Sequence, residues 1–171
     1  MASVHPKPVR GTVKQQAQDP DDAMNANDSL YEQDFHAWTE EQARLLRAGL
    51  TAAADLAHIA EEIETLGASE RRELESRLKV LLQHLLKWRY QPDARSSGWL
   101  GTITEQRDQL DTLLRQSPSL RRLVPEYLGH AYTKARRAAA LETELDRSLF
   151  PETCPFAQER VLDPEFLPDA A

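Results

Sequence analysis

Four polar residues stand on helical faces that are otherwise apolar, and their side chains offer the clearest chemistry in this sequence. They are Gln42, His84, Gln106 and Glu142. An imidazole beside a carboxylate can move protons or bind a ligand, and amide groups can orient either one. The same groups can instead form a closed hydrogen-bonded network that only fixes how the helices pack. The sequence leaves both interpretations open.

A metal site in a helical bundle needs ligands that recur on one helix face, in the order Glu-x-x-His. No glutamate here precedes a histidine by three residues. The reversed order occurs at His58 and Glu61, which point away from the apolar stripe of their helix. We therefore expect no metal and no cofactor. Glu62 and Glu64 flank that stripe and can act as acid and base, although salt-bridged helix edges show the same pattern.

Basic and aromatic residues gather around the end of a predicted helix, at Lys87, Trp88, Arg89, Arg95 and Trp99. Such a corner can stack bases or bind phosphate, and it is also typical of a basic helix end that meets its neighbour. The net charge of −7 argues against a general nucleic-acid binder, which needs a basic face.

Cys154 is the single cysteine and immediately precedes Pro155. If Pro155 begins a short helix, the thiol lies at a positive helix end, its pKa falls, and it becomes reactive. A lone packed cysteine has the same sequence context. One cysteine excludes an internal disulfide framework and favours a reducing cytoplasm.

The elements that must position these side chains follow from the spacing of apolar residues. It predicts helices over about 30–47, 53–66, 69–91, 97–116 and 125–145, with Gly49 and Gly67 as stops and a short helix from Pro155. The helix over 69–91 is apolar around most of its circumference, so we expect it at the centre, with His84 between Val80 and Trp88. Its leucines form one broad side, at Leu74, Leu78, Leu81, Leu82, Leu85 and Leu86.

The chain of 171 residues, with 40% hydrophobic and 29% charged residues, suits one domain with a sizeable core. We predict an all-α, single-domain, mostly antiparallel helical bundle with a C-terminal, proline-punctuated wrap. Residues 1–27 are polar, and we predict that they form a disordered tail before a bundle domain over 28–171. No apolar run approaches the ~20 residues that cross a bilayer, and no secretory signal is recognisable, so we expect a cytoplasmic protein.

Several short segments together resemble a known bacterial family. They are Leu30-Tyr31, Asp34-Phe35, Trp38 and Gln42; Glu61 to Gly67; Glu70-Arg71 and Leu74; Leu81 to Trp88; Tyr90 to Pro92, Trp99, Thr102-Ile103 and Gln106-Arg107; Pro118 to Leu120, Ala131-Tyr132, Ala135-Arg136 and Glu142-Thr143; and Phe150-Pro151 with Cys154-Pro155. The chain thereby resembles the bacterial domain-of-unknown-function family 29 over about 30–168. The resemblance implies a helical, bundle-like fold and supplies no activity.

The absence of a catalytic motif favours a small, non-enzymatic interaction or accessory protein that binds another protein or a second copy of itself. A rival hypothesis is a ligand-binding or enzymatic bundle that uses the polar cluster around His84. A third is a nucleic-acid-associated factor that uses the corner around Lys87, Arg89 and Arg95. Helical bundles host many functions, so the fold does not choose among them.

Overall fold

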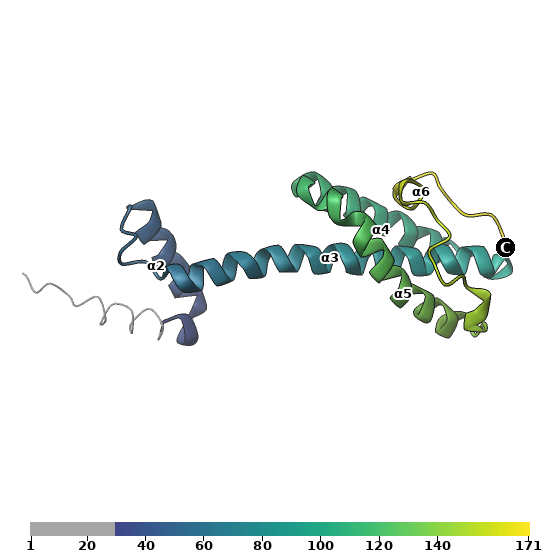
Figure 1. The fold of residues 1–171 in the computed structure, drawn as a ribbon, viewed down its shortest axis with the longest axis horizontal. Helices are drawn as coiled ribbons and strands as arrows, with labels where there is room; N and C mark the ends of the chain where they lie inside the picture. Colours follow the sequence, from purple (N-terminus) through teal and green to yellow (C-terminus); the bar gives the residue numbers. More distant parts are fainter. Residues whose placement is uncertain (1–29) are drawn as a thin grey trace, which may run out of the picture. The chain divides into compact units, whose positions relative to one another are not determined.

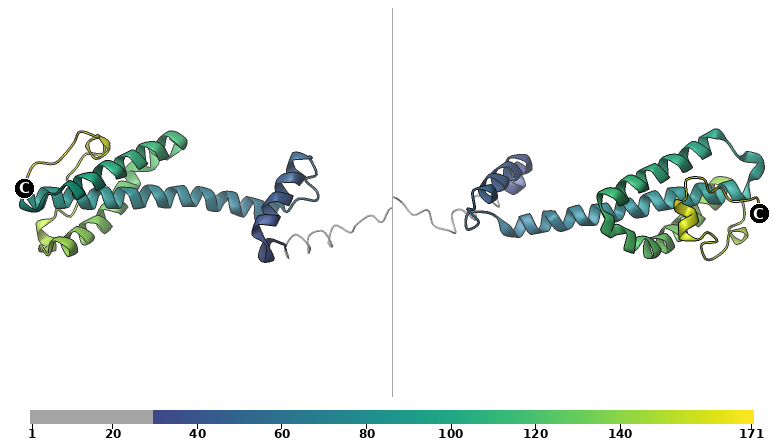
Figure 2. Two further views of the ribbon diagram at one scale, coloured as in Figure 1. Left: turned by 180° about the vertical axis from the view of Figure 1, so that it is seen from behind. Right: turned by 90° about the horizontal axis from the view of Figure 1, so that it is seen from above.

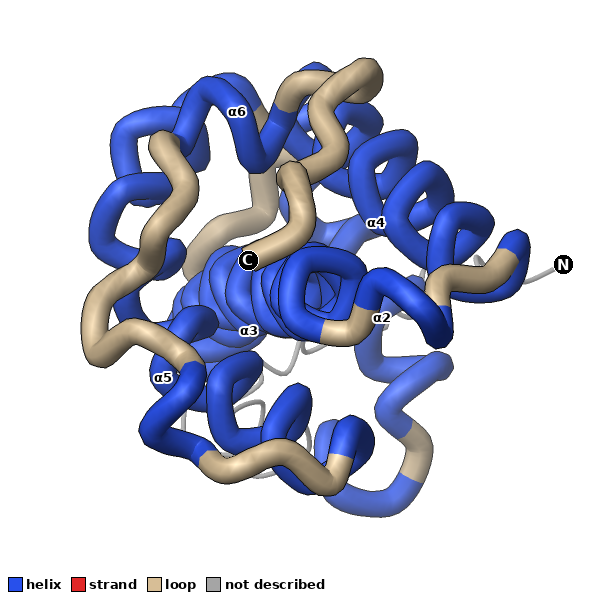
Figure 3. The backbone as a smooth tube through the Cα atoms, turned by 90° about the vertical axis from the view of Figure 1, so that its right-hand side faces the viewer, coloured by secondary structure: helices blue, strands red, loops and turns tan. Residues whose placement is uncertain are grey.

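The computed structural model describes residues 30–171, and within them every regular element is a helix (Figure 3). In chain order these are α2 (Phe35–Arg47), α3 (Leu56–Tyr90), the 3-10 helix η1 (Pro92–Ala94), α4 (Ser97–Gln116), η2 (Pro118–Leu123), α5 (Val124–Thr143), η3 (Arg147–Leu149) and α6 (Gln158–Leu162). The prediction of an all-α helical bundle is confirmed. The predicted polar tail over 1–27 lies outside the described residues.

The chain divides into two compact units, of which the described parts are residues 30–63 and 64–171. The first unit contains α2 and the first turns of α3. The second contains the remainder of α3 and every later element. The single bundle domain expected over 28–171 stays a prediction, and each unit is described by itself below.

In the first unit, local capping sets where the helices begin and end. The Asp34 carboxylate accepts a hydrogen bond from the Ala37 N–H at 3.0 Å and caps α2. Gly49 follows α2 with a φ of 70°, a left-handed conformation that glycine adopts without strain. Asp55 precedes α3, and its carboxylate accepts a hydrogen bond from the His58 N–H at 3.2 Å.

α3 continues without interruption from Leu56 to Tyr90, so the prediction of two helices separated at Gly67 is wrong. A glycine inside a helix costs only about 1 kcal/mol relative to alanine. Good helix formers on both sides, such as Glu64, Leu66 and Arg71, outweigh that cost. A glycine therefore ends a helix only where the chain also needs a left-handed residue, as it does at Gly49.

The core of the second unit forms around α3, as predicted. The six leucines expected on its broad apolar side are all fully buried. They pack in one cluster with residues of α4, η2, α5 and the C-terminal segment, including Ile103, Leu110, Leu120, Tyr132 and Phe150. α4 runs back beside the C-terminal half of α3, and α5 then crosses in the opposite direction (Figures 1 and 2). Alanines at 131, 135 and 139 on α5 are buried, which permits close helix approach.

The segment after α5 returns to the end of α3 and forms the expected wrap (Figure 1). Arg107 on α4 holds it, because its guanidinium is buried and donates to three backbone carbonyls. Nε donates to Val161 at 3.0 Å, Nη1 to Pro164 at 3.1 Å and Nη2 to Phe166 at 2.7 Å. The chain closes with a bond from the Ala171 N–H to the Arg89 carbonyl at 3.1 Å.

None of the helices in the described part of the chain combines the length and the apolar character that a membrane span requires.

Candidate functional site

Gln42, the first member of the predicted polar cluster, serves the first unit. It is buried, and its Oε1 accepts a hydrogen bond from the Asp55 N–H at 2.8 Å. The Asp55 carboxylate also lies 2.6 Å from His58 Nδ1 and accepts from the Trp38 indole at 3.4 Å. Burial alone would raise the pKa of Asp55, but the hydrogen bonds from His58 outweigh it and lower that pKa. Gln42 therefore helps to fix the residue that caps α3.

Glu142, predicted to be interior, lies at the rim of the second unit with its side chain 50% exposed. Its carboxylate accepts from Lys87 Nζ at 2.6 Å and from Gln83 Nε2 at 2.5 Å. The Lys87 side chain is only 8% exposed, and its Nζ also lies 4.5 Å from the centroid of the Trp99 ring. The hydrogen bond from Lys87 lowers the pKa of Glu142, so the carboxylate is charged at neutral pH.

His84 is half-buried beside this pair. Its Nδ1 lies 2.9 Å from the Val80 carbonyl oxygen, which can only accept, so Nδ1 carries the proton. Burial lowers the pKa of His84, and nearby Lys87 and Lys79 add to that effect. The hydrogen bond to Val80 and the charge of Glu142 oppose it. The ring is thus neutral at physiological pH.

The observed polar set is Gln83, Lys87 and Glu142, with His84 beside it. Gln106 is half-buried on α4. Sequence reasoning missed Gln83, although its spacing of four residues from Lys87 on a helix with a broad apolar face was a usable signal. A ligand-binding or catalytic role for this polar set stays a prediction.

The predicted basic-aromatic corner separates into three arrangements, because successive residues on α3 point about 100° apart. Lys87 turns to Glu142 and Trp99. Arg95 Nε donates to the Trp88 carbonyl at 2.9 Å, and its guanidinium carbon lies 5.1 Å from the Trp88 ring. Arg89 turns instead to the C-terminal segment, 5.9 Å from the Phe156 ring. The five residues therefore do not present one continuous basic platform.

Cys154 does not lie at the start of a helix, since α6 begins at Gln158 rather than at Pro155. Its Sγ lies 3.5 Å from the Phe156 carbonyl, and burial raises the pKa of the thiol. The hypothesis of a reactive thiolate is therefore wrong for this arrangement. Within residues 30–171, no three His, Cys, Asp or Glu side chains come together in a way that can hold a metal ion.

The most unusual surface is the apolar stripe at the start of α3, formed by Leu56, Ile59, Ile63 and Leu66. These positions recur at spacings of three, four and three residues, so they lie on one helix face. Leu56, Ile63 and Leu66 are 53%, 63% and 67% exposed, and Ile59 is half-buried. We call this set the exposed stripe.

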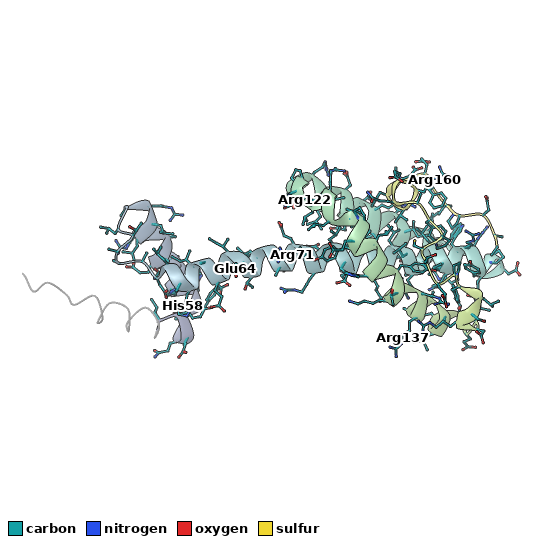
Figure 4. The ribbon with its side chains drawn as sticks, viewed as in Figure 1. His58, Glu64, Arg71, Arg122, Arg137 and Arg160 are labelled. Atoms are coloured by element: carbon teal, nitrogen blue, oxygen red, sulfur yellow. The ribbon has the colours of Figure 1, made fainter. Side chains whose placement is uncertain are left out.

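Within the first unit, the stripe residues Leu56, Ile59 and Ile63 stay uncovered because α2 and the residues before it contact the neighbouring face of α3. The Tyr31 ring stacks on His58, with centroids 4.1 Å apart, and its hydroxyl donates to Glu62 at 2.5 Å. That bond raises the pKa of Tyr31 to about 12. Trp38 reaches Asp55 on the same side, and Figure 4 marks His58 at this junction. The contacted residues are Asp55, which caps α3, and His58 and Glu62 on α3. Each directly precedes a stripe residue, and successive residues of a helix are rotated by about 100°.

Comparison with known proteins places this arrangement in a family. The model of the family described as "Domain of unknown function DUF29" matches residues 30–167. The chain belongs to this family. No curated protein and no solved structure matches the chain.

The match to the DUF29 family begins at the first described residue and includes the exposed stripe, Arg107 and the three residues that Arg107 binds. Both units therefore belong to the DUF29 region. The resemblance drawn from the sequence is confirmed.

Proposed function

We propose that the protein is a non-enzymatic interaction module whose exposed stripe binds an amphipathic helix of another protein. The observation that carries this proposal is the exposure of three large aliphatic side chains on one helix face. Scattered apolar residues are normal on a surface, but an ordered row of them marks an interaction site. A row at this spacing suits a partner helix that presents its own apolar residues at the same spacing.

The charge around the exposed stripe supports a basic partner. Residues 30–66 have a formal charge of −6, from Glu32, Asp34, Glu40, Glu41, Asp55, Glu61, Glu62 and Glu64 against Arg44 and Arg47. Glu62 and Glu64 flank the stripe itself. Residues 67–171 contain equal numbers of acidic and basic residues. Two copies joined through their stripes would bring like charges together, whereas lysine or arginine beside a partner's apolar row would be attracted.

Two synthetic helices test this partner chemistry. Both have leucines at the spacing of the stripe and a length of roughly 20 residues, and one has lysine flanks while the other has glutamate flanks. We expect the protein to bind the lysine peptide in fluorescence anisotropy and the glutamate peptide at least tenfold more weakly. Leu66→Ser and Ile63→Ser should each lower the affinity for the lysine peptide by about tenfold or more. The reason is that a leucine or isoleucine buried in the complex contributes about 1.5–3 kcal/mol.

Leu141→Ser is the matched control, because Leu141 is 72% exposed and belongs to α5, a helix that contributes no residue to the stripe. If it weakens binding as much as Leu66→Ser, the peptide adheres nonspecifically and the proposal is wrong. Sedimentation of the free protein tests self-association. A dimer that Leu66→Ser dissociates would show that a second copy covers the stripe, against the proposed basic partner.

We also propose that the protein acts in the cytoplasm. The single cysteine, half-buried as a thiol, supports a compartment in which no disulfide is needed. Fractionation of cells that express the tagged chain tests this location.

A further inference from the structure

A cavity of about 270 Å³ opens in the second unit where the end of α3 meets the C-terminal segment. Two arginines, Arg89 on α3 and Arg160 on α6, line it together with Phe156 and Phe166. Figure 4 marks Arg160 on α6. One carboxylate, Asp169, also lines the cavity, and two prolines and Ala157 complete the apolar part. The lining thus combines two permanent positive charges and two phenyl rings with one negative charge.

Arg89, one of the lining residues, has a donor that no other group in the described part of the chain uses. Its Nε is buried, and no group within residues 30–171 accepts a hydrogen bond from it. A buried N–H without a partner is costly, so native structures satisfy nearly all of them with protein, water or a ligand. Arg160 is partly engaged, because its Nη1 lies 3.6 Å from an Asp163 oxygen. Of the two arginines, Arg89 is therefore the one with a buried donor that lacks an acceptor among the described residues.

The two rings fix the shape of the cavity. Their centroids are 5.9 Å apart and their planes meet at 68°, an edge-to-face pair. Each ring lies against one guanidinium, with the Arg89 carbon 5.9 Å from Phe156 and the Arg160 carbon 4.6 Å from Phe166. Arg107 holds the Phe166 carbonyl, so this wall is anchored to α4. A guanidinium that rests on a ring keeps its N–H edges available for a ligand.

We propose that this cavity binds a small carboxylate with a flat apolar body, of the size of benzoate. The planar arginine fork matches the two oxygens of a carboxylate, and Arg89 and Arg160 both line the cavity. The apolar body lies against Phe156 and Phe166. The cavity has room for several water molecules, and therefore for a ligand of that size. The cavity shares no residue with the exposed stripe. The two proposals can therefore be tested independently.

Calorimetric titration of the full chain with benzoate tests the site, with benzamide and inorganic phosphate as matched probes. We expect benzoate to bind with a Kd of about 1 mM or tighter, and both other probes to bind at least tenfold more weakly. Arg89→Gln should weaken benzoate by tenfold or more. Arg95→Gln removes a neighbouring arginine that rests on Trp88 instead, and should leave the affinity unchanged.

Arg160→Gln provides a second test that does not depend on a half-buried position, since Arg160 is exposed on its short helix. This substitution should lower the affinity for benzoate several-fold, and the protein should still fold. Absence of benzoate binding overturns the proposal. Equal affinity for phosphate overturns the role of the rings, and equal affinity for benzamide overturns the role of the charge. Leu66→Ser should bind benzoate as the unchanged chain does.

Discussion

Arg107 Nη2 donates to the Phe166 carbonyl at 2.7 Å, which ties the middle of α4 to a residue near the end of the chain. Two further donors of the same guanidinium bind Val161 and Pro164. Burial lowers the pKa of Arg107, and the charge of Asp163 opposes that effect. One side chain therefore replaces the hydrogen bonds that an irregular segment cannot make with itself.

Arg107→Lys should destabilise the protein by about 3 kcal/mol, because a single ammonium group cannot reach three carbonyls and hydrogen bonds to charged groups contribute about 1.5–3 kcal/mol each. Urea titration gives the free energy, and hydrogen exchange should show faster exchange over residues 158–171. Arg115→Lys is the control, since Arg115 forms an exposed pair with Asp111 and should change stability by less than about 0.5 kcal/mol. Similar hydrogen-exchange rates over residues 158–171 in both variants would show that Arg107 does not hold the C-terminal segment.

Gly67→Ala should stabilise the protein by roughly 0.5–1 kcal/mol. Gly67 lies inside α3, and an added Cβ would meet only Arg71 Nη1 at 3.6 Å, an ordinary contact. Gly49→Ala should instead destabilise it by about 1–2 kcal/mol, because alanine is strained at a φ of 70°. Thermal unfolding followed by circular dichroism measures both. A loss of stability in Gly67→Ala would mean that α3 is interrupted at that position.

Stability should fall as the pH drops below 6.5 because of His84. Burial lowers the folded-state pKa of His84 below its ordinary value of 6.5, so the unfolded chain binds the proton more readily. The free energy of unfolding therefore decreases from pH 6.5 down to the folded-state pKa. Lys79 and Lys87 strengthen this effect, whereas the hydrogen bond to Val80 and the charge of Glu142 oppose it. Urea titrations at several pH values should show the loss in the unchanged chain.

His84→Gln should reduce that loss, since glutamine has a donor but does not titrate. His130→Gln, at an exposed position on α5, is the control and should keep the loss. A separate decrease at more acidic pH belongs to Glu142, whose pKa is lowered from 4.5 and whose bond to Lys87 is lost on protonation. Equal slopes above pH 5 in both glutamine variants would exclude His84 as the cause.

Glu142→Ala should cost roughly 1–3 kcal/mol, because it leaves the buried Lys87 ammonium without its carboxylate. Lys87→Met should cost less, since it removes the buried charge and leaves Glu142 in contact with water. The double variant should resemble Lys87→Met alone. Urea midpoints for the three proteins decide the matter, and additive costs would show that the two residues are not coupled.

The helical pattern predicted the core of the second unit because burial there follows one period. The leucines of α3 repeat at helical spacing, and the side that they share is the buried side. At the start of α3 the same spacing does not lead to burial. Leu56 and Ile63 form an equally regular row, yet they are exposed, because Tyr31, Trp38 and Gln42 bind the neighbouring face through rings and hydrogen bonds. A pattern of apolar residues identifies a helix face that is suited to burial. It does not tell whether this chain or another molecule covers that face.

The candidate sites were harder to predict than the core. Arg107 was missed, although its place between Ile103 and Leu110 on an inward face indicated a buried cation. Its partners are backbone carbonyls, which leave no pattern in the sequence. The sequence analysis grouped Arg89 with Lys87 and Arg95 in one corner because they are close in sequence. On a helix, however, residues that are close in sequence point in different directions. The cavity at Arg89 depends on Phe166, which lies far along the chain.

The hydrogen bonds of the two units differ in the length of chain that they close, and this difference implies an order of assembly. In the first unit, Gln42 reaches Asp55 across 13 residues and Tyr31 reaches Glu62 across 31. In the second, Gln83 reaches Glu142 and Arg107 reaches Phe166 across 59 residues each. Short loops close sooner than long ones, and the N-terminal part leaves the ribosome first. The exposed stripe should therefore form, and become accessible to the proposed partner, before the C-terminal residues that Arg107 binds have been synthesised.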